Sequence, residues 1–267
     1  MAKNNSFIKL EGTLDGLTFY EKDGENFVKT KSAISKNRIY NDPAFVRTRE
    51  NNQEFSGCAK ASKAVREAFA SVVKLMGDTY IAARLTGVMK KINKNGTGLR
   101  GERTIDIATN KEQLVGFEFN PKDPFSSKFY APYDAPVLGV NRNDVTVTIP
   151  DFDAGSFINP PEGATHCKIV LASGLVSNFE YEAALNTYEP DNEEENGKGG
   201  TDYSDPILLT GLVGSDTILT VDIPLGSGGI TPSVSNVIAL GIIFYQEING
   251  DLYELASGNG MQVIMVG

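Results

Sequence analysis

The chain has 267 residues, of which 40% are hydrophobic and 22% are charged, with a formal net charge of −9. This composition is typical of a soluble globular protein and excludes the weakly hydrophobic, disordered class. The longest apolar run, 237–245, is too short to span a bilayer. The polar start 1–6 lacks the apolar segment of a Sec signal peptide, so we expect a cytoplasmic protein, with non-Sec export to the cell surface or a particle left open.

The charge is unevenly distributed along the chain. Residues 1–104 carry 19 Lys and Arg against 11 Asp and Glu, and residues 105–267 carry 6 against 23, which gives net charges of +8 and −17. A basic N-terminal module could bind nucleic acid, or it could contact the acidic part of a neighbouring copy in a salt-sensitive way. The two parts could also be independently solvated. Nucleic acid is the least favoured of these three interpretations.

Three short β-strands are predicted at the N-terminus. Strand-like segments at 7–10, 17–21 and 26–30 are separated by Asp15-Gly16 and Asp23-Gly24, and Asp-Gly is a strong signal for tight hairpin turns. This pattern predicts an antiparallel β-meander. It contains too few apolar residues for a core of its own, so it must pack on the following helices or on a neighbouring subunit.

A helical hairpin is predicted over 42–94, after a polar connector at 31–41 that has no periodicity. Asp42 followed by Pro43 is typical of a helix start. At the break we expect Gly77 in a left-handed conformation and Asp78 as the cap of the second helix. The apolar positions at helical spacing are Ala61, Ala64, Val65, Ala68, Phe69, Val72, Val73 and Met76, then Ile81, Leu85, Val88, Met89 and Ile92. Each set predicts one buried face, with basic residues outside it.

A glycine-rich segment follows the helices. Gly96, Gly98 and Gly101 spell G-x-G-x-x-G, but in a dinucleotide-binding fold these glycines follow a strand and open a helix. Here they follow a helix and lead into an extended segment. We therefore expect no cofactor at this motif.

The rest of the chain is predicted to be an antiparallel β-sandwich that resembles immunoglobulin or fibronectin type III domains. Asn249-Gly250 predicts a hairpin, and the absence of Trp excludes the core of a true immunoglobulin domain. The fold class is α+β, mainly β, with a module at 1–105 and a sandwich at 106–267. The predicted strands are 114–119, 128–132, 144–149, 165–172, 206–213, 217–223, 235–246, 251–256 and 261–266.

Two further features of this part are open to interpretation. The acidic segment 189–205 is predicted to be a solvated, mobile loop, and a weak cation or partner site is the alternative because its spacing does not fit an EF-hand. The final strand, 261–266, either belongs to the sandwich or offers an edge to a neighbour.

No residue pattern indicates catalysis or a metal site. His166 is the single histidine, and Cys167 beside it would point to the opposite face of a strand. Zinc sites need more Cys and His than the chain contains, and we expect Cys58 and Cys167 to be reduced and buried, although a disulfide between them stays open. A hydrolase that uses a carboxylate pair also stays open, but we expect a protein that is not an enzyme.

The N-terminal motifs carry a family resemblance. They are Phe7-Ile8-Lys9-Leu10-Glu11-Gly12-Thr13, Thr18-Phe19-Tyr20, Asn41-Asp42-Pro43-Ala44-Phe45, Arg47-Thr48-Arg49-Glu50-Asn51 and Arg84-Leu85-Thr86. This series resembles an uncharacterised protein family of Bacteroidota, over roughly residues 7–105. The resemblance implies no familiar enzyme class and transfers no site residue.

The sequence leads to a hypothesis of self-assembly. We predict a non-enzymatic structural protein that forms an oligomer or filament through its basic N-terminal module and its acidic sandwich. Arginine favours such interfaces because its planar group pairs with carboxylates at two points. The alternatives are a glycan- or protein-binding sandwich and a phage-derived or nucleic-acid-associated component. The candidate interface residues are Arg47, Arg49, Glu50, Phe7, Phe19 and Tyr20.

Overall fold

The computed structural model describes residues 2–5, 8–31, 34–226 and 228–267. It divides the chain into two compact units, 1–50 and 51–267. Antiparallel strands predominate and helices are few, which confirms the predicted α+β, mainly β class. The division between the two units falls after residue 50, inside a helix, rather than at the predicted position 105. In the part of the chain that the structure describes, no helix combines the length and apolar character needed to cross a membrane.

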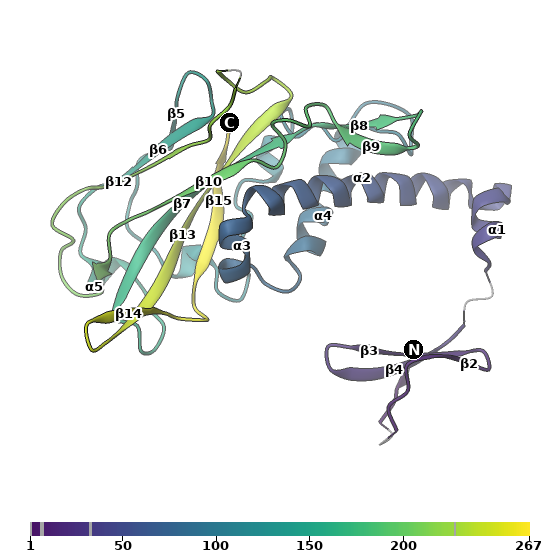
Figure 1. Ribbon diagram of the computed structural model, residues 1–267, viewed down its shortest axis with the longest axis horizontal. Coiled ribbons are helices and arrows are strands. Elements are labelled where there is room, and N and C mark those ends of the chain that lie inside the picture. Colours follow the sequence, from purple (N-terminus) through teal and green to yellow (C-terminus); the bar gives the residue numbers. More distant parts are fainter. Residues whose placement is uncertain (1, 6–7, 32–33, 227) are drawn as a thin grey trace. The chain divides into compact units, whose positions relative to one another are not determined.

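The first unit contains a four-stranded antiparallel sheet with the order β1-β4-β3-β2, of which β2, β3 and β4 are labelled in Figure 1. Its strands are β1 (Ala2–Lys3), β2 (Gly12–Leu14), β3 (Leu17–Lys22) and β4 (Glu25–Thr30). Asp15-Gly16 and Asp23-Gly24 form the two turns with positive φ angles, so the hairpin turns that define the predicted meander are present. The first hairpin strand is β2, however, and the described part of the predicted strand 7–10 is irregular, whereas Phe7 lies outside the described residues.

The predicted polar connector is in part a helix, so that prediction is wrong. Helix α1 (Lys36–Asn41) begins at Ser35, whose hydroxyl accepts a hydrogen bond from the Arg38 N–H at 3.2 Å. Its six residues are too few to display a periodic apolar face. Asp42 then caps the 3₁₀ helix η1 (Pro43–Phe45) by accepting from the Ala44 N–H at 2.9 Å. The predicted helix start is therefore present as a 3₁₀ turn before α2.

The helical block consists of α2 (Val46–Ala68), α3 (Ala70–Met76) and α4 (Ile81–Asn95). Helices α2 and α4 run antiparallel, because Ser62 on α2 donates to the Ala82 carbonyl on α4, whereas Glu54, earlier in α2, pairs with Lys90, later in α4. The predicted apolar positions are buried or partly buried. The break near residue 77 is present.

The conformation at this break differs from the prediction. Gly77 is extended at φ −90° rather than left-handed. Asp78 provides no side-chain cap to α4. Its carboxylate instead accepts a hydrogen bond from Arg84 Nη2 at 2.6 Å, because an ion pair with a nearby guanidinium competes with capping.

The second unit is built on a six-stranded sheet with two long central strands, β7 and β13. A three-stranded sheet has the order β12-β6-β5, and β8 pairs with β9. The strands are β5 (Val137–Leu138), β6 (Asp144–Ile149), β7 (His166–Ser177), β8 (Phe179–Glu182), β9 (Thr187–Pro190), β10 (Gly199–Tyr203), β11 (Ile207–Leu208), β12 (Thr217–Asp222), β13 (Val234–Ile248), β14 (Asp251–Glu254) and β15 (Gly260–Val266). The short helices are η2 (Lys111–Gln113), η3 (Phe125–Ser127) and α5 (Ala154–Phe157).

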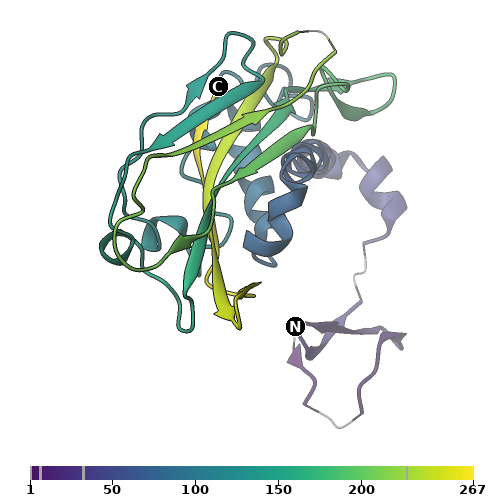
Figure 2. The same cartoon turned by 60° about the vertical axis from the view of Figure 1, so that its left-hand side comes forward.

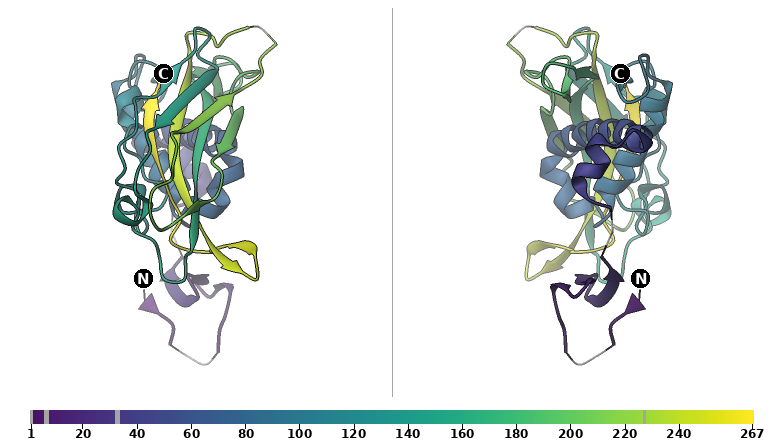
Figure 3. Two further views of the ribbon diagram at one scale, coloured as in Figure 1. Left: turned by 90° about the vertical axis from the view of Figure 1, so that its left-hand side faces the viewer. Right: turned by 90° about the vertical axis from the view of Figure 1, so that its right-hand side faces the viewer.

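Both faces of the central strands are buried. In β7, Val170 and Ala172 belong to a core shared with α2–α4, whereas Ile169 and Leu171 belong to a core shared with β6 and β12. Figures 2 and 3 show the helices on one side of the central strands and β6 and β12 on the other side. The helices therefore need the C-terminal sheet to bury their apolar faces, which explains why no unit boundary falls at 105.

The predicted strands have mixed outcomes. Those at 144–149, 217–223, 235–246, 251–256 and 261–266 are confirmed as β6, β12, β13, β14 and β15, and the segment 165–172 forms the first part of β7. The Asn249-Gly250 hairpin is confirmed by pairing of Ile248 with Asp251. The segment 206–213 contains only the two-residue β11.

Three segments differ in structure from their predictions. The segments 114–119 and 128–132 form isolated bridges rather than strands. Several of their apolar residues belong to the core although the segments themselves are loops. The acidic segment 189–205 is ordered by hydrogen bonds and contains β10, so the prediction of a mobile loop is wrong. Within it, Glu195 is buried and accepts from the Thr231 N–H at 2.9 Å.

Candidate functional site

The charged residues predicted at an interface interact within their own chain. Arg47 and Glu50 lie in the first turns of α2 and form an ion pair at 2.9 Å. Arg49 donates to the main-chain carbonyls of Ile39 and Asp42 at 2.8 and 3.0 Å. Arg49 therefore holds the turn after α1 in place. This role could not be predicted from the sequence because α1 itself was not predicted.

Phe19 and Tyr20, two of the aromatic residues predicted at the interface, lie on opposite faces of the first-unit sheet, because they are neighbours on β3. Tyr20 stacks on Phe27 with ring centres 5.7 Å apart. Phe19 is opposite Val28 in the register and shares its face with Leu17 through strand alternation. Both faces of this sheet thus carry apolar side chains, and Phe7 lies outside the described residues.

The first unit has almost no interior. Among its described residues, which are 2–5, 8–31 and 34–50, Asn26 is the one that is buried. Leu14 and Leu17 have exposed fractions of 66% and 42%. A sheet of this size is ordinarily stabilised by a layer packed on at least one face. The described part of this unit supplies no such layer.

A buried carboxylate in the second unit was missed by the sequence analysis. Glu54 on α2 is 1% exposed and accepts hydrogen bonds from Lys90 at 2.5 Å, from Arg103 at 2.7 and 2.9 Å and from the Gly101 N–H at 2.9 Å. It ties α2 to α4 and to the glycine-rich segment. Its position one turn before Cys58, on the extension of the predicted apolar face, was the available signal.

The environment of Glu54 lowers its pKa. Burial works to raise the pKa, but hydrogen bonds from Arg103, Lys90 and Gly101 outweigh it and lower the pKa from 4.5 to about 2. A lowered folded-state pKa stabilises the fold above the unfolded value and loses this contribution as the pH falls through the folded value.

This shift predicts a pH-dependent stability difference. The gap between the unfolded and folded pKa values of Glu54 corresponds to roughly 3 kcal/mol. We expect the free energy of unfolding, measured by urea titration, to differ most between the wild type and Glu54→Gln at neutral pH. The difference should narrow between about pH 4.5 and about pH 2. Parallel curves over that window would contradict this assignment.

The two cysteines and the single histidine lie in different environments. Cys58 and Cys167 are free and buried, and burial raises the pKa of each thiol to about 12. His166 Nδ1 lies 3.0 Å from the Thr165 hydroxyl, while Cys167 belongs to the core. Within the described residues, no group of three or more His, Cys, Asp or Glu side chains is arranged to hold a metal ion.

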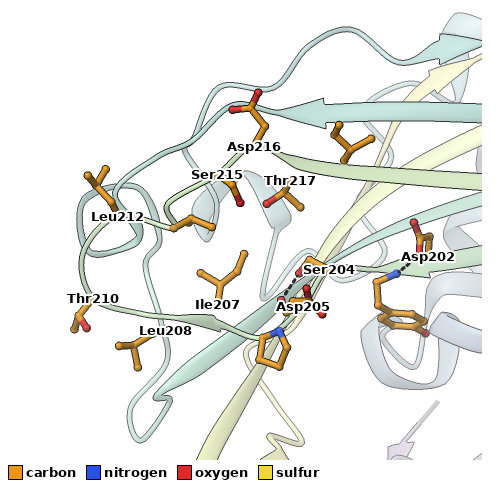
Figure 4. A pocket seen from close by; sticks show the side chains of 14 residues that line it. Asp202, Ser204, Asp205, Ile207, Leu208, Thr210, Leu212, Ser215, Asp216 and Thr217 are labelled. Atoms are coloured by element: carbon orange, nitrogen blue, oxygen red, sulfur yellow. Dashed lines mark hydrogen bonds between the residues drawn. The ribbon is translucent and has the colours of Figure 1, made fainter.

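A groove lies between two strand edges of the second unit, those of β11 and β12 (Figure 4). Directly after β11 the Leu209 N–H donates to the Thr165 carbonyl, so the neighbouring Leu208 main chain points away from β7. Directly after β12 the Ile223 N–H donates to the Asn143 carbonyl. By alternation, the main chain of Ile218 points away from β6. Both edges thus present main-chain donors and acceptors outside their own ladders.

Asp202 joins the two sides where the groove begins. Its carboxylate accepts from the Tyr203 N–H on the outer edge of β10 and from the Thr220 N–H on β12, at 2.9 and 2.8 Å. A Cβ added to Gly200 would lie 2.8 Å from the Val221 side chain, so the strands run close together there. They continue one curved surface, a half-barrel, and separate beyond Asp202.

The groove has a volume of about 750 Å³ and mixed walls. Leu208, Leu212 and Ile218 line it, although they are 52%, 72% and 63% exposed. Asp202, Asp205 and Asp216 supply carboxylates. Among the described residues that form its lining, none is Lys or Arg. The site therefore suits an extended ligand that combines apolar and basic groups.

No family model, curated protein or solved structure matches the chain. The geometry of the two surfaces, the uncovered sheet and the groove, is accordingly the basis for assigning a function.

Proposed function

We propose that this chain is a non-enzymatic structural protein that assembles with copies of itself into an oligomer or filament, and that the first unit makes contacts between copies. The observation that carries the proposal is the lack of an interior in that unit. Apolar side chains on both faces of its sheet gain stability when a second layer covers them. A neighbouring copy can supply that layer.

The distribution of charge adds a second argument. Residues 1–50 carry nine Lys and Arg against seven Asp and Glu, a net charge of +2, whereas residues 105–267 carry −17. Contacts between the first unit and the acidic strands of another copy are therefore favourable, and salt should weaken them. Most of the positive charge lies on α2–α4, so these helices form a second basic surface for the same contact.

We also propose that the curled strands of the second unit form a β-sandwich that is displayed on such an assembly. The shared core between the β7–β13 face and the β6–β12 face supports this description.

Electron microscopy and light scattering on the purified chain test the proposal. We expect regular particles or filaments at low salt and their partial dispersal at high salt. Leu17→Lys should weaken the assembly about ten- to hundredfold, because about 1.5–3 kcal/mol of apolar burial is lost at each contact.

Leu185→Lys is the matched control. Leu185 is 65% exposed between β8 and β9, so its substitution should leave the particle mass unchanged. Circular dichroism should show that both variants retain the unfolding transition of the wild type. A monomer under all conditions would overturn the proposal and would turn attention to ligands of the groove.

A further inference from the structure

The groove between β11 and β12 is shaped for strand addition. An extended peptide placed there can bond to the outward main-chain groups of Leu208 on one wall and Ile218 on the other. Open strand edges are ordinarily covered, charged or shortened to prevent unwanted pairing. Here Asp202 joins the edges at one end, residues 209–216 connect them at the other end, and exposed Leu and Ile side chains border the groove between the two ends.

The walls restrict the sequence that can bind. In a strand, alternate side chains point to opposite faces, so a peptide with apolar residues at alternate positions can contact Leu208, Leu212 and Ile218 with one face. The carboxylates of Asp205 and Asp216 favour a lysine between those apolar positions. The expected ligand is therefore an extended segment with an apolar–basic–apolar pattern.

We propose that the groove binds residues 8–10 of a second copy, with Lys9 directed towards the aspartates. This inference rests on the proposed function and assigns one of the contacts between copies. Ile8-Lys9-Leu10 has the required pattern, and residues 2–10 contain two lysines and no acidic residue. Residues 8–11 adopt neither helix nor strand, and Ile8 and Leu10 are 52% and 42% exposed.

Disulfide trapping between two full-length variants tests the proposal. Chains with Leu10→Cys and chains with Ile218→Cys, distinguished by size tags, are mixed and mildly oxidised. Docking raises the local thiol concentration, so we expect at least about tenfold more cross-linked heterodimer than with a Leu185→Cys partner. The wild type, whose two cysteines are buried, measures the background.

A charge reversal distinguishes this docking from a general association. Lys9→Glu should reduce the cross-link, and Asp205→Lys in the partner should restore it, whereas a contact that ignores these charges would not recover. Asp205 is exposed, so its substitution leaves the core intact.

The remaining outcomes distinguish the proposal of docking at the groove from the proposal of self-assembly. Particles in light scattering without the cross-link would overturn docking at the groove and leave self-assembly standing. A cross-link confined to single chains of the double variant Leu10→Cys/Ile218→Cys in dilute solution would show that the segment fills its own groove. Absence of both particles and cross-link would overturn both proposals.

Discussion

Replacing Glu54 by glutamine should lower the free energy of unfolding by about 3–5 kcal/mol, the cost of removing one partner from a buried ion pair. The glutamine keeps the size of the side chain but leaves Lys90 and Arg103, whose side chains are 21% and 24% exposed, beside a neutral group. Urea unfolding at neutral pH, followed by circular dichroism of the helices, measures the loss.

Glu67→Gln is the control for this prediction. Glu67 pairs with Lys63 at 3.1 Å on the surface of α2, where the two side chains are 55% and 65% exposed. Such a pair contributes about 0.3–0.5 kcal/mol. Equal losses for the two glutamine variants would contradict the assignment of Glu54 as the buried tie. A double variant of Glu54 and Arg103 should lose less than the sum of the single variants.

The sequence predicted the elements whose signals are local. The alternation in 144–149 and the Asn249-Gly250 turn depend on neighbouring residues, and both are present. The apolar faces of α2 and α4 were likewise visible from helical spacing. A face does not identify its partner, however. The helices pack on β7 and β13, far along the chain, and local patterns contain no information about that choice.

The candidate site was less accessible to prediction. The pairing of Arg47 with Glu50 follows from their spacing on a helix, but the contacts of Arg49 depend on α1, which is too short to have a periodic signal. The groove depends on where β10 and β12 separate. That separation is a property of sheet curvature and of one side chain, Asp202, whose acidic neighbours made its segment resemble a solvated loop.

Gly57→Ala should destabilise the second unit by about 1–3 kcal/mol, the range for overpacking a well-filled core. A Cβ added at Gly57, inside α2, would clash with the ring of Tyr188. That ring is fully buried, and its hydroxyl donates to the Gly101 and Arg103 carbonyls at 3.2 and 2.9 Å. The ring can move away only by weakening these bonds. Thermal and urea unfolding measure the effect.

The same substitution in the neighbouring helix should have the opposite sign. Gly87 lies inside α4, is exposed, and a Cβ added there meets nothing within 4 Å. Alanine favours a helix interior over glycine by about 0.8–1.0 kcal/mol, so Gly87→Ala should stabilise the unit by up to about that amount. Because propensity acts equally in both helices, the difference between the two variants isolates the contact with Tyr188. Stabilisation by both substitutions would show that α2 does not pack closely on the Tyr188 ring.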